Sequence, residues 1–170
     1  MRRLKYGIAL LFALLLIVGF SLTALASNPH FISEGTDSIN SSGALVATGF
    51  KEAGLGSTTT TEKITLSADG TATYACINGG GKHPSASNKE TVSGPVSGSG
   101  NFPVRNGQTT GGSISAGPPS AGNFSCPSGQ KLVLAFVSYT NVLLTGLAGD
   151  TSSLPDVSRC LFDSGLGLCP

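Results

Sequence analysis

The sequence predicts a single all-β domain: an antiparallel β-sandwich of about seven short strands stapled by disulfides, with a small β-barrel as the alternative. Gly, Ser and Thr supply 63 of the 170 residues, and Trp is absent. Short runs of β-branched and apolar residues alternate with Gly, Pro, Asn and Asp turn signals, a pattern typical of sheets. Four Cys residues offer two cross-links.

The first 26 residues have the pattern of a secretory signal peptide. A basic head precedes an apolar run over residues 7–20, and Ala24, Leu25 and Ala26 form a small-x-small cleavage pattern. We therefore expect cleavage between Ala26 and Ser27 and a secreted, extracellular or cell-surface localisation. A retained membrane anchor is the alternative, because residues 7–26 are long enough to span a bilayer.

The charge balance argues against nucleic-acid and membrane partners. Loss of Arg2, Arg3 and Lys5 with the signal leaves seven basic and nine acidic residues, thinly spread along the chain. No basic patch is present, so we expect no nucleic-acid partner and no membrane partner after signal removal.

Composition divides the chain into four segments. Residues 1–26 are the signal peptide, and residues 27–42, polar and without periodicity, are expected to be a flexible lead-in. Residues 43–148 are expected to form the β-sandwich domain, and residues 149–170 a C-terminal tail with a disulfide loop.

The first strands are expected at residues 44–50 and in a hairpin over residues 62–77. Its two arms, 64–67 and 71–77, flank Ala68, Asp69 and Gly70, which suit a three-residue turn with Gly70 in the left-handed region. This register places Ile64 opposite Tyr74 and Cys76 on the inward face.

The later strands are predicted from weaker patterns and one strong turn. Residues 91–97 and 101–105 are weak strands, and Asn106 and Gly107 indicate a hairpin with residues 108–116 returning. Residues 131–147 are apolar on both faces, which indicates an interior strand that continues after a bend near Tyr139.

Cys76, Cys126, Cys160 and Cys169 are expected to form structural disulfides, because an even count in an exported chain favours bridges over metal. Four Cys allow three pairings. We favour Cys76–Cys126 and Cys160–Cys169, since the last two are close in sequence and enclose a Gly-rich loop.

Motifs for catalysis are missing from the sequence. There is no Gly-x-Ser-x-Gly, and the Gly run before Lys82 fails the phosphate-loop pattern, so we assign no catalytic, cofactor-binding or metal-binding residue and expect no cofactor. His30 and His83 are the only histidines. Four acidic residues could in principle supply a glycosidase pair, but surface positions are the simpler interpretation: Glu52, Glu62, Asp69 and Glu90.

Other candidate surface features are two aromatic residues and two modification motifs. Phe102 and Phe124 are the aromatics most expected to be exposed, because one precedes Pro103 and the other lies in a loop. Asn40 and Asn123 match the N-glycosylation pattern, which a chain rich in Asn and Ser also produces by chance.

Four stretches between residues 44 and 147 resemble a group of small exported bacterial proteins of unassigned function. They are 50–56 (FKEAGLG), 75–80 (ACINGG) with Asn88 and Lys89, 124–127 (FSCP) and 137–142 (VSYTNV). The resemblance implies export and a Cys76–Cys126 bridge. It supplies no catalytic residue, and it does not place the tail with Cys160 and Cys169.

Two classes of function follow. The first is a secreted, non-catalytic extracellular or cell-surface protein, acting as a binding module for a cell-wall or extracellular polysaccharide or a protein partner. The alternative is a secreted hydrolase whose acidic residues converge only in the fold, or a small secreted inhibitor using the loop between Cys160 and Cys169.

Overall fold

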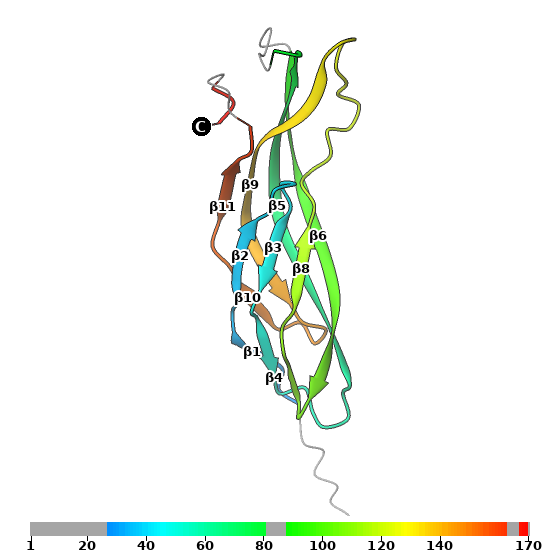
Figure 1. Cartoon of the computed structure of the whole chain (residues 1–170). Coiled ribbons are helices and arrows are strands. Elements are labelled where there is room, and N and C mark those ends of the chain that lie inside the picture. The colour runs from blue at the N-terminus through cyan, green and yellow to red at the C-terminus, as the bar shows by residue number, and fades with distance from the viewer. Residues whose placement is uncertain (1–26, 81–87, 163–166, 170) are drawn as a thin grey trace, which may run out of the picture.

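The computed structural model describes residues 27–80, 88–162 and 167–169, and it confirms the all-β, antiparallel prediction. Three strands dominate the molecule and run along its long axis (Figure 1). The described strands are β1 (His30–Ser33), β2 (Thr36–Ile39), β3 (Leu45–Thr48), β4 (Lys51–Ala53), β5 (Thr61–Ile77), β6 (Lys89–Arg105), β7 (Gln108–Thr109), β8 (Ser113–Ala116), β9 (Lys131–Thr145), β10 (Thr151–Ser153) and β11 (Val157–Cys160). The expectation of about seven short strands is therefore wrong in number and in length.

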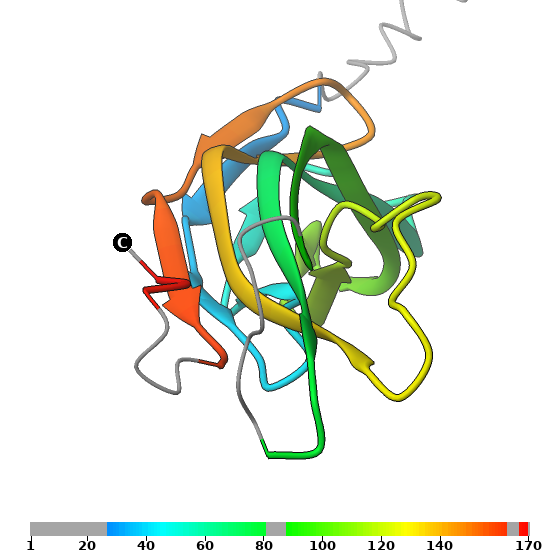
Figure 2. The ribbon, with the colours of Figure 1, turned by 90° about the horizontal axis from the view of Figure 1, so that it is seen from above.

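The larger sheet has the order β10-β9-β5-β6-β7, and β11 also pairs with β9. It curls into a half-barrel, and a second sheet of order β2-β3-β8 covers its open side (Figure 2). A pair formed by β1 and β4 completes the fold. The architecture thus combines the two packed layers of a sandwich with the curl of a barrel.

The predicted hairpin over residues 62–77 is wrong, because these residues form one continuous strand, β5, of 17 residues. Asp69 and Gly70 lie inside it, paired with Pro95 and Gly94 of β6. A Cβ on Gly70 would lie 2.9 Å from Pro119 Cδ and 3.3 Å from the Tyr139 ring. Gly70 is therefore needed because its neighbours leave no space for a side chain, whereas a turn was expected there.

Strand β6 likewise joins the two weak strands predicted at 91–97 and 101–105. Its inner face carries Gly98 and Gly100, and the backbone of β8 packs directly on it. A Cβ on Gly98 would lie 2.0 Å from the carbonyl oxygen of Ser115 in β8. Glycine in this strand thus permits close contact between the two sheets.

The hairpin at Asn106 and Gly107 is confirmed. Both residues have positive φ, 52° and 71°, and Arg105 pairs with Gln108, as in a two-residue type I′ turn. The returning chain does not stay in one strand: β7 ends at Thr109, and β8 crosses to the smaller sheet.

Strand β9 confirms the interior strand predicted at 131–147. It pairs with β5 on one side and with β10 and β11 on the other. The expected bend lies at Asn141, which has φ 53° and donates its backbone N–H to Asp156 Oδ1 at 3.1 Å.

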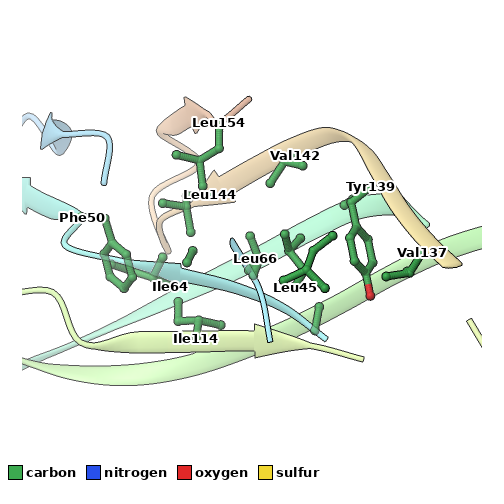
Figure 3. Close-up of a cluster of buried hydrophobic side chains, with 14 of the residues drawn as sticks. Leu45, Phe50, Ile64, Leu66, Ile114, Val137, Tyr139, Val142, Leu144 and Leu154 are labelled. Atoms are coloured by element: carbon green, nitrogen blue, oxygen red, sulfur yellow. The ribbon is translucent and has the colours of Figure 1, made fainter. Parts of the chain in front are cut away.

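The core lies between the two sheets (Figure 3). Leu45 of β3 faces Ile64 and Leu66 of β5, and all three are fully buried. The Tyr139 hydroxyl of β9 donates to the Gly43 carbonyl at 2.6 Å and so ties the two sheets together. Phe102, expected to be exposed, is 8% exposed and packs edge-to-face on Phe50 with ring centroids 5.2 Å apart.

Both ends of the predicted domain are also corrected. Residues 27–42 are not a lead-in without structure: they form β1 and β2, and Ile39 is in the core. Residues 151–160 do not belong to a separate tail, because β10 and β11 pair with β9 and Leu154 is in the core. These strands were not recognised in the sequence because they are short and polar, with only one face buried.

Two disulfides have the favoured pairing, Cys76–Cys126 and Cys160–Cys169. Cys76 lies near the end of β5 and Cys160 at the end of β11, so both bridges lie at the end of the molecule where Figure 1 marks the C-terminus. On the loop-entropy model, the longer bridge stabilises by about 4 kcal/mol and the shorter by about 2.7 kcal/mol.

The close contact between β6 and β8 predicts that alanine substitution destabilises the protein at one glycine of β6 and not at another. Gly98→Ala should lower the free energy of unfolding by about 1–3 kcal/mol, because the methyl group meets the Ser115 carbonyl. Gly94→Ala is the control, since no atom lies within 4 Å of its Cβ position. Urea unfolding of both variants measures the difference, and equal stabilities would contradict the close packing.

Candidate functional site

Three acidic side chains gather at the end of the molecule opposite the disulfides. Glu52 comes from β4, Glu62 from the start of β5, and Asp150 from the turn between β9 and β10. The alternation of β5 turns Glu62 to the same inner face as Ile64. Glu52 and Ala53 are both buried, although Lys51 beside them is exposed.

The geometry places Glu52 and Asp150 against one glycine. A Cβ on Gly146 would lie 2.5 Å from Asp150 Oδ1 and 2.9 Å from Glu52 Oε1, so both carboxyl groups approach the same point. Glu62 Oε1 accepts the Leu147 N–H at 2.6 Å. The Glu52 N–H donates to Thr109 Oγ1 at 3.3 Å, which fixes β4 beside β7.

The carboxyl pair of Glu52 and Asp150 is buried without a partner. Glu52 is 0% exposed, and none of the four carboxyl oxygens accepts a hydrogen bond from the described residues. Burial, the negative charges of Asp150 and Glu62, and the side-chain interaction with Asp150 together raise the pKa of Glu52 to about 8. Such a shift is typical of carboxyl groups that cannot all be ionised together.

The interpretation of the acidic residues as surface groups is thus wrong for two of the four. Glu52 and Glu62 are buried, while Asp69 and Glu90 are exposed. Asp69 does not sit in a turn: it lies in β5, and its carboxylate accepts the Asn141 side-chain N–H at 2.8 Å. The sequence analysis missed Asp150, whose only local signal is the preceding Gly149 of a turn.

The carboxyl oxygens of this pair have almost no exposed surface. A cavity of about 610 Å³ is lined by residues between 27 and 30, 54 and 57, and 106 and 108, and by no carboxylate. His30 lines it, with its Nδ1 2.8 Å from the Asn28 carbonyl. Within the described parts of the chain, no group of three or more His, Cys, Asp or Glu is placed to hold a metal ion.

A second feature is a hydroxyl-bearing surface on the outer side of β5 and β6. Outward residues of the two strands stand opposite one another, as in Ser67 and Ser97. The hydroxyls of Thr71 and Ser93 are hydrogen-bonded at 2.9 Å, and those of Thr73 and Thr91 at 3.2 Å. We call this surface the hydroxyl face; it consists of Thr65, Ser67, Thr71, Thr91, Ser93, Ser97 and Ser99.

The remaining candidate residues are not brought together. His83 and the loop residues 163–166 lie outside the described residues. Asn40 closes a turn, since its Oδ1 accepts hydrogen bonds from the Ser42 and Ala44 N–H groups at 3.0 Å. Asn123 is exposed, and Phe124 beside it is half-buried.

The comparisons with protein families, with curated proteins and with solved structures found no match to this chain. Among residues 27–80, 88–162 and 167–169, no helix is long and apolar enough to cross a membrane.

Burial of the carboxyl pair predicts its resistance to chemical labelling. In the folded protein, a carbodiimide with an amine should label Asp69 and Glu90 but leave Glu52 unmodified, because Glu52 is 0% exposed. Mass spectrometry of peptides measures the labelling, and the reduced, urea-unfolded chain is the control in which all three residues react. Labelling of folded Glu52 as fast as Glu90 would indicate an open cleft and would favour a hydrolase.

Proposed function

We propose that the chain is an exported, non-catalytic binding module that contacts a cell-wall or extracellular polysaccharide through the hydroxyl face. The observation on which this proposal depends is the run of paired hydroxyls along β5 and β6. One cross-strand pair of this face, Thr71 with Ser93, is already oriented by a hydrogen bond, and the Thr91 hydroxyl is hydrogen-bonded to that of the buried Thr73. An extended sugar polymer presents hydroxyls that complement such donors and acceptors.

The low charge of this surface favours a neutral, hydroxyl-rich partner. Between residues 65 and 73 of β5, Asp69 is the only charged side chain, and Asn141 binds its carboxylate. A strongly anionic or cationic polymer would find little electrostatic complementarity here. The hydrolase alternative lacks comparable support, because the oxygens of Glu52 and Asp150 are buried.

Export is supported by the signal pattern and by the two disulfides, which persist in oxidising compartments. The position of the expected cleavage also suits the fold, because β1 begins at His30, soon after Ser27. A Cβ on Gly54 would lie 2.0 Å from the Asn28 carbonyl oxygen, so the chain is packed against β4 almost from Ser27 onward.

The polysaccharide proposal predicts retention that depends on the hydroxyl face. The wild-type protein should co-sediment with insoluble polysaccharides or purified cell walls. The double variant Ser97→Glu, Ser99→Glu should lose affinity by about tenfold or more, because two carboxylates replace neutral hydroxyls. Ser38→Glu on β2 is the matched control, since Ser38 is an exposed strand serine of the other sheet.

Retention no greater than that of an unrelated β domain would contradict the proposed function. Retention by the wild type with equal loss in the double variant and in Ser38→Glu would remove the hydroxyl face as the contact surface.

The export proposal predicts the start of the mature chain. When the full-length protein is expressed in a host with a general secretion pathway, the secreted form should begin at Ser27. Intact-mass measurement and N-terminal sequencing check this start, and Ala26→Arg should block processing because a small residue is needed there. A secreted or cell-associated product that still contains residues 1–26 would support the anchor alternative.

A further inference from the structure

The turn between β9 and β10 covers the carboxyl pair, and Leu154 at the far end of this segment lies in the core. We call residues 146–154 the latch. Within it, the Gly146 N–H donates to the Asp150 carbonyl at 2.9 Å, and the Leu154 N–H donates to the Val142 carbonyl at 2.9 Å. Only three residues of β10 pair with β9. The latch is therefore a short segment at the edge of the sheet, anchored in the core at Leu154 and closed over the carboxyl groups at its other end.

Those groups are carboxyls. Glu62 Oε1 holds the Leu147 N–H, and the side chains of Glu52 and Asp150 meet against Gly146. Four buried oxygens without a donor are unstable in a folded interior unless something is added to them. One proton bound between two adjacent carboxyl groups supplies the missing hydrogen-bond donor.

We propose that Glu52 and Asp150 share one proton in the closed molecule, and that loss of this proton opens the latch, so that the fold contains a pH-controlled device at the end opposite its disulfides. With the proton present, Glu52 donates to the Asp150 carboxylate. Without it, two buried negative charges lie side by side with Glu62 nearby, and their repulsion is relieved when the latch moves into water.

Charged groups on the neighbouring strands offer no compensation. Glu62 faces the pair from β5 and adds to the repulsion. The other charged side chains of the described strands around it are exposed, and β7 and β10 have none: His30 of β1, Lys51 of β4, Lys63 and Asp69 of β5, and Lys89, Glu90 and Arg105 of β6. Two titratable tyrosines also lie on these strands, Tyr74 of β5 and the buried Tyr139 of β9, and their hydroxyls donate to the Pro119 and Gly43 carbonyls. On β9, Lys131 is exposed and lies at the distant end of the strand.

The direction of the pH effect follows from linkage. The pKa of Glu52 rises in the folded protein from 4.5 to about 8, so the folded chain binds more protons than the unfolded chain between these values. The free energy of unfolding therefore falls as the pH rises through this range. The latch should open before the rest of the molecule, because β10 is a three-residue strand at the edge of the sheet.

Hydrogen exchange of the full chain tests the device. After correction for intrinsic rates, the protection of amides in residues 146–154 should fall by about tenfold or more between pH 5 and pH 8.5, while β5 keeps its protection. Glu52→Gln should keep the latch closed at both pH values, because its amide donates to Asp150 without titrating. Glu90→Gln, on the exposed side of β6, is the control and should behave as the wild type.

A second variant tests the proposal if the first one does not fold. If Glu52→Gln does not fold, Asp150→Asn should likewise remove the pH dependence of the latch. Unchanged pH dependence in a folded Glu52→Gln or Asp150→Asn variant would overturn the proposal. A bound cation in place of the proton would also overturn it, and would appear as a rise in melting temperature with calcium at pH 8.5, reversed by chelator and absent in the variant.

Discussion

The rest of the structure depends on the pairing of β5 on both of its edges. Strand β6 runs beside it from residue 61 to residue 75, and β9 runs beside it from residue 65 to residue 77. One strand thereby delivers Glu62 to the carboxyl pair, Ile64 and Leu66 to the core, and Cys76 to a disulfide. The carboxyl pair at one end of the molecule and the disulfide at the other are therefore positioned by the same strand.

Glycine residues within strands allow the two sheets to pack closely. The chain has 24 glycines, and the sequence pattern indicated a turn at Gly70. Gly98 and Gly70 instead stand within long strands, where a neighbouring backbone or ring occupies the space of a side chain. The small sheet can thus lie close to the larger one, and Tyr139 can reach the Gly43 carbonyl across the core. The entropic cost of glycine is offset by close packing.

The sequence predicted the features whose causes are local. The turn at Asn106 and Gly107 follows from two residues that tolerate positive φ, and β9 follows from its continuous apolar run. The prediction of a hairpin at Asp69 was wrong because Gly70 makes room for Pro119, which is distant in sequence, and does not form a turn. The burial of Glu52 was equally hidden, since it arises only when residues 146–150 fold over β4. Patterns within a strand carry no information about such partners.

The described chain begins and ends at opposite poles of an elongated body. Ser27 borders the same cavity as Gly107, at one pole, whereas Cys169 is bonded to Cys160 at the other (Figure 1). Because β5 has 17 residues, the poles are separated by a distance on the order of 50 Å. A label or fusion joined at Ser27 would therefore stand at the pole opposite the Cys160–Cys169 disulfide, separated from it by the length of β5.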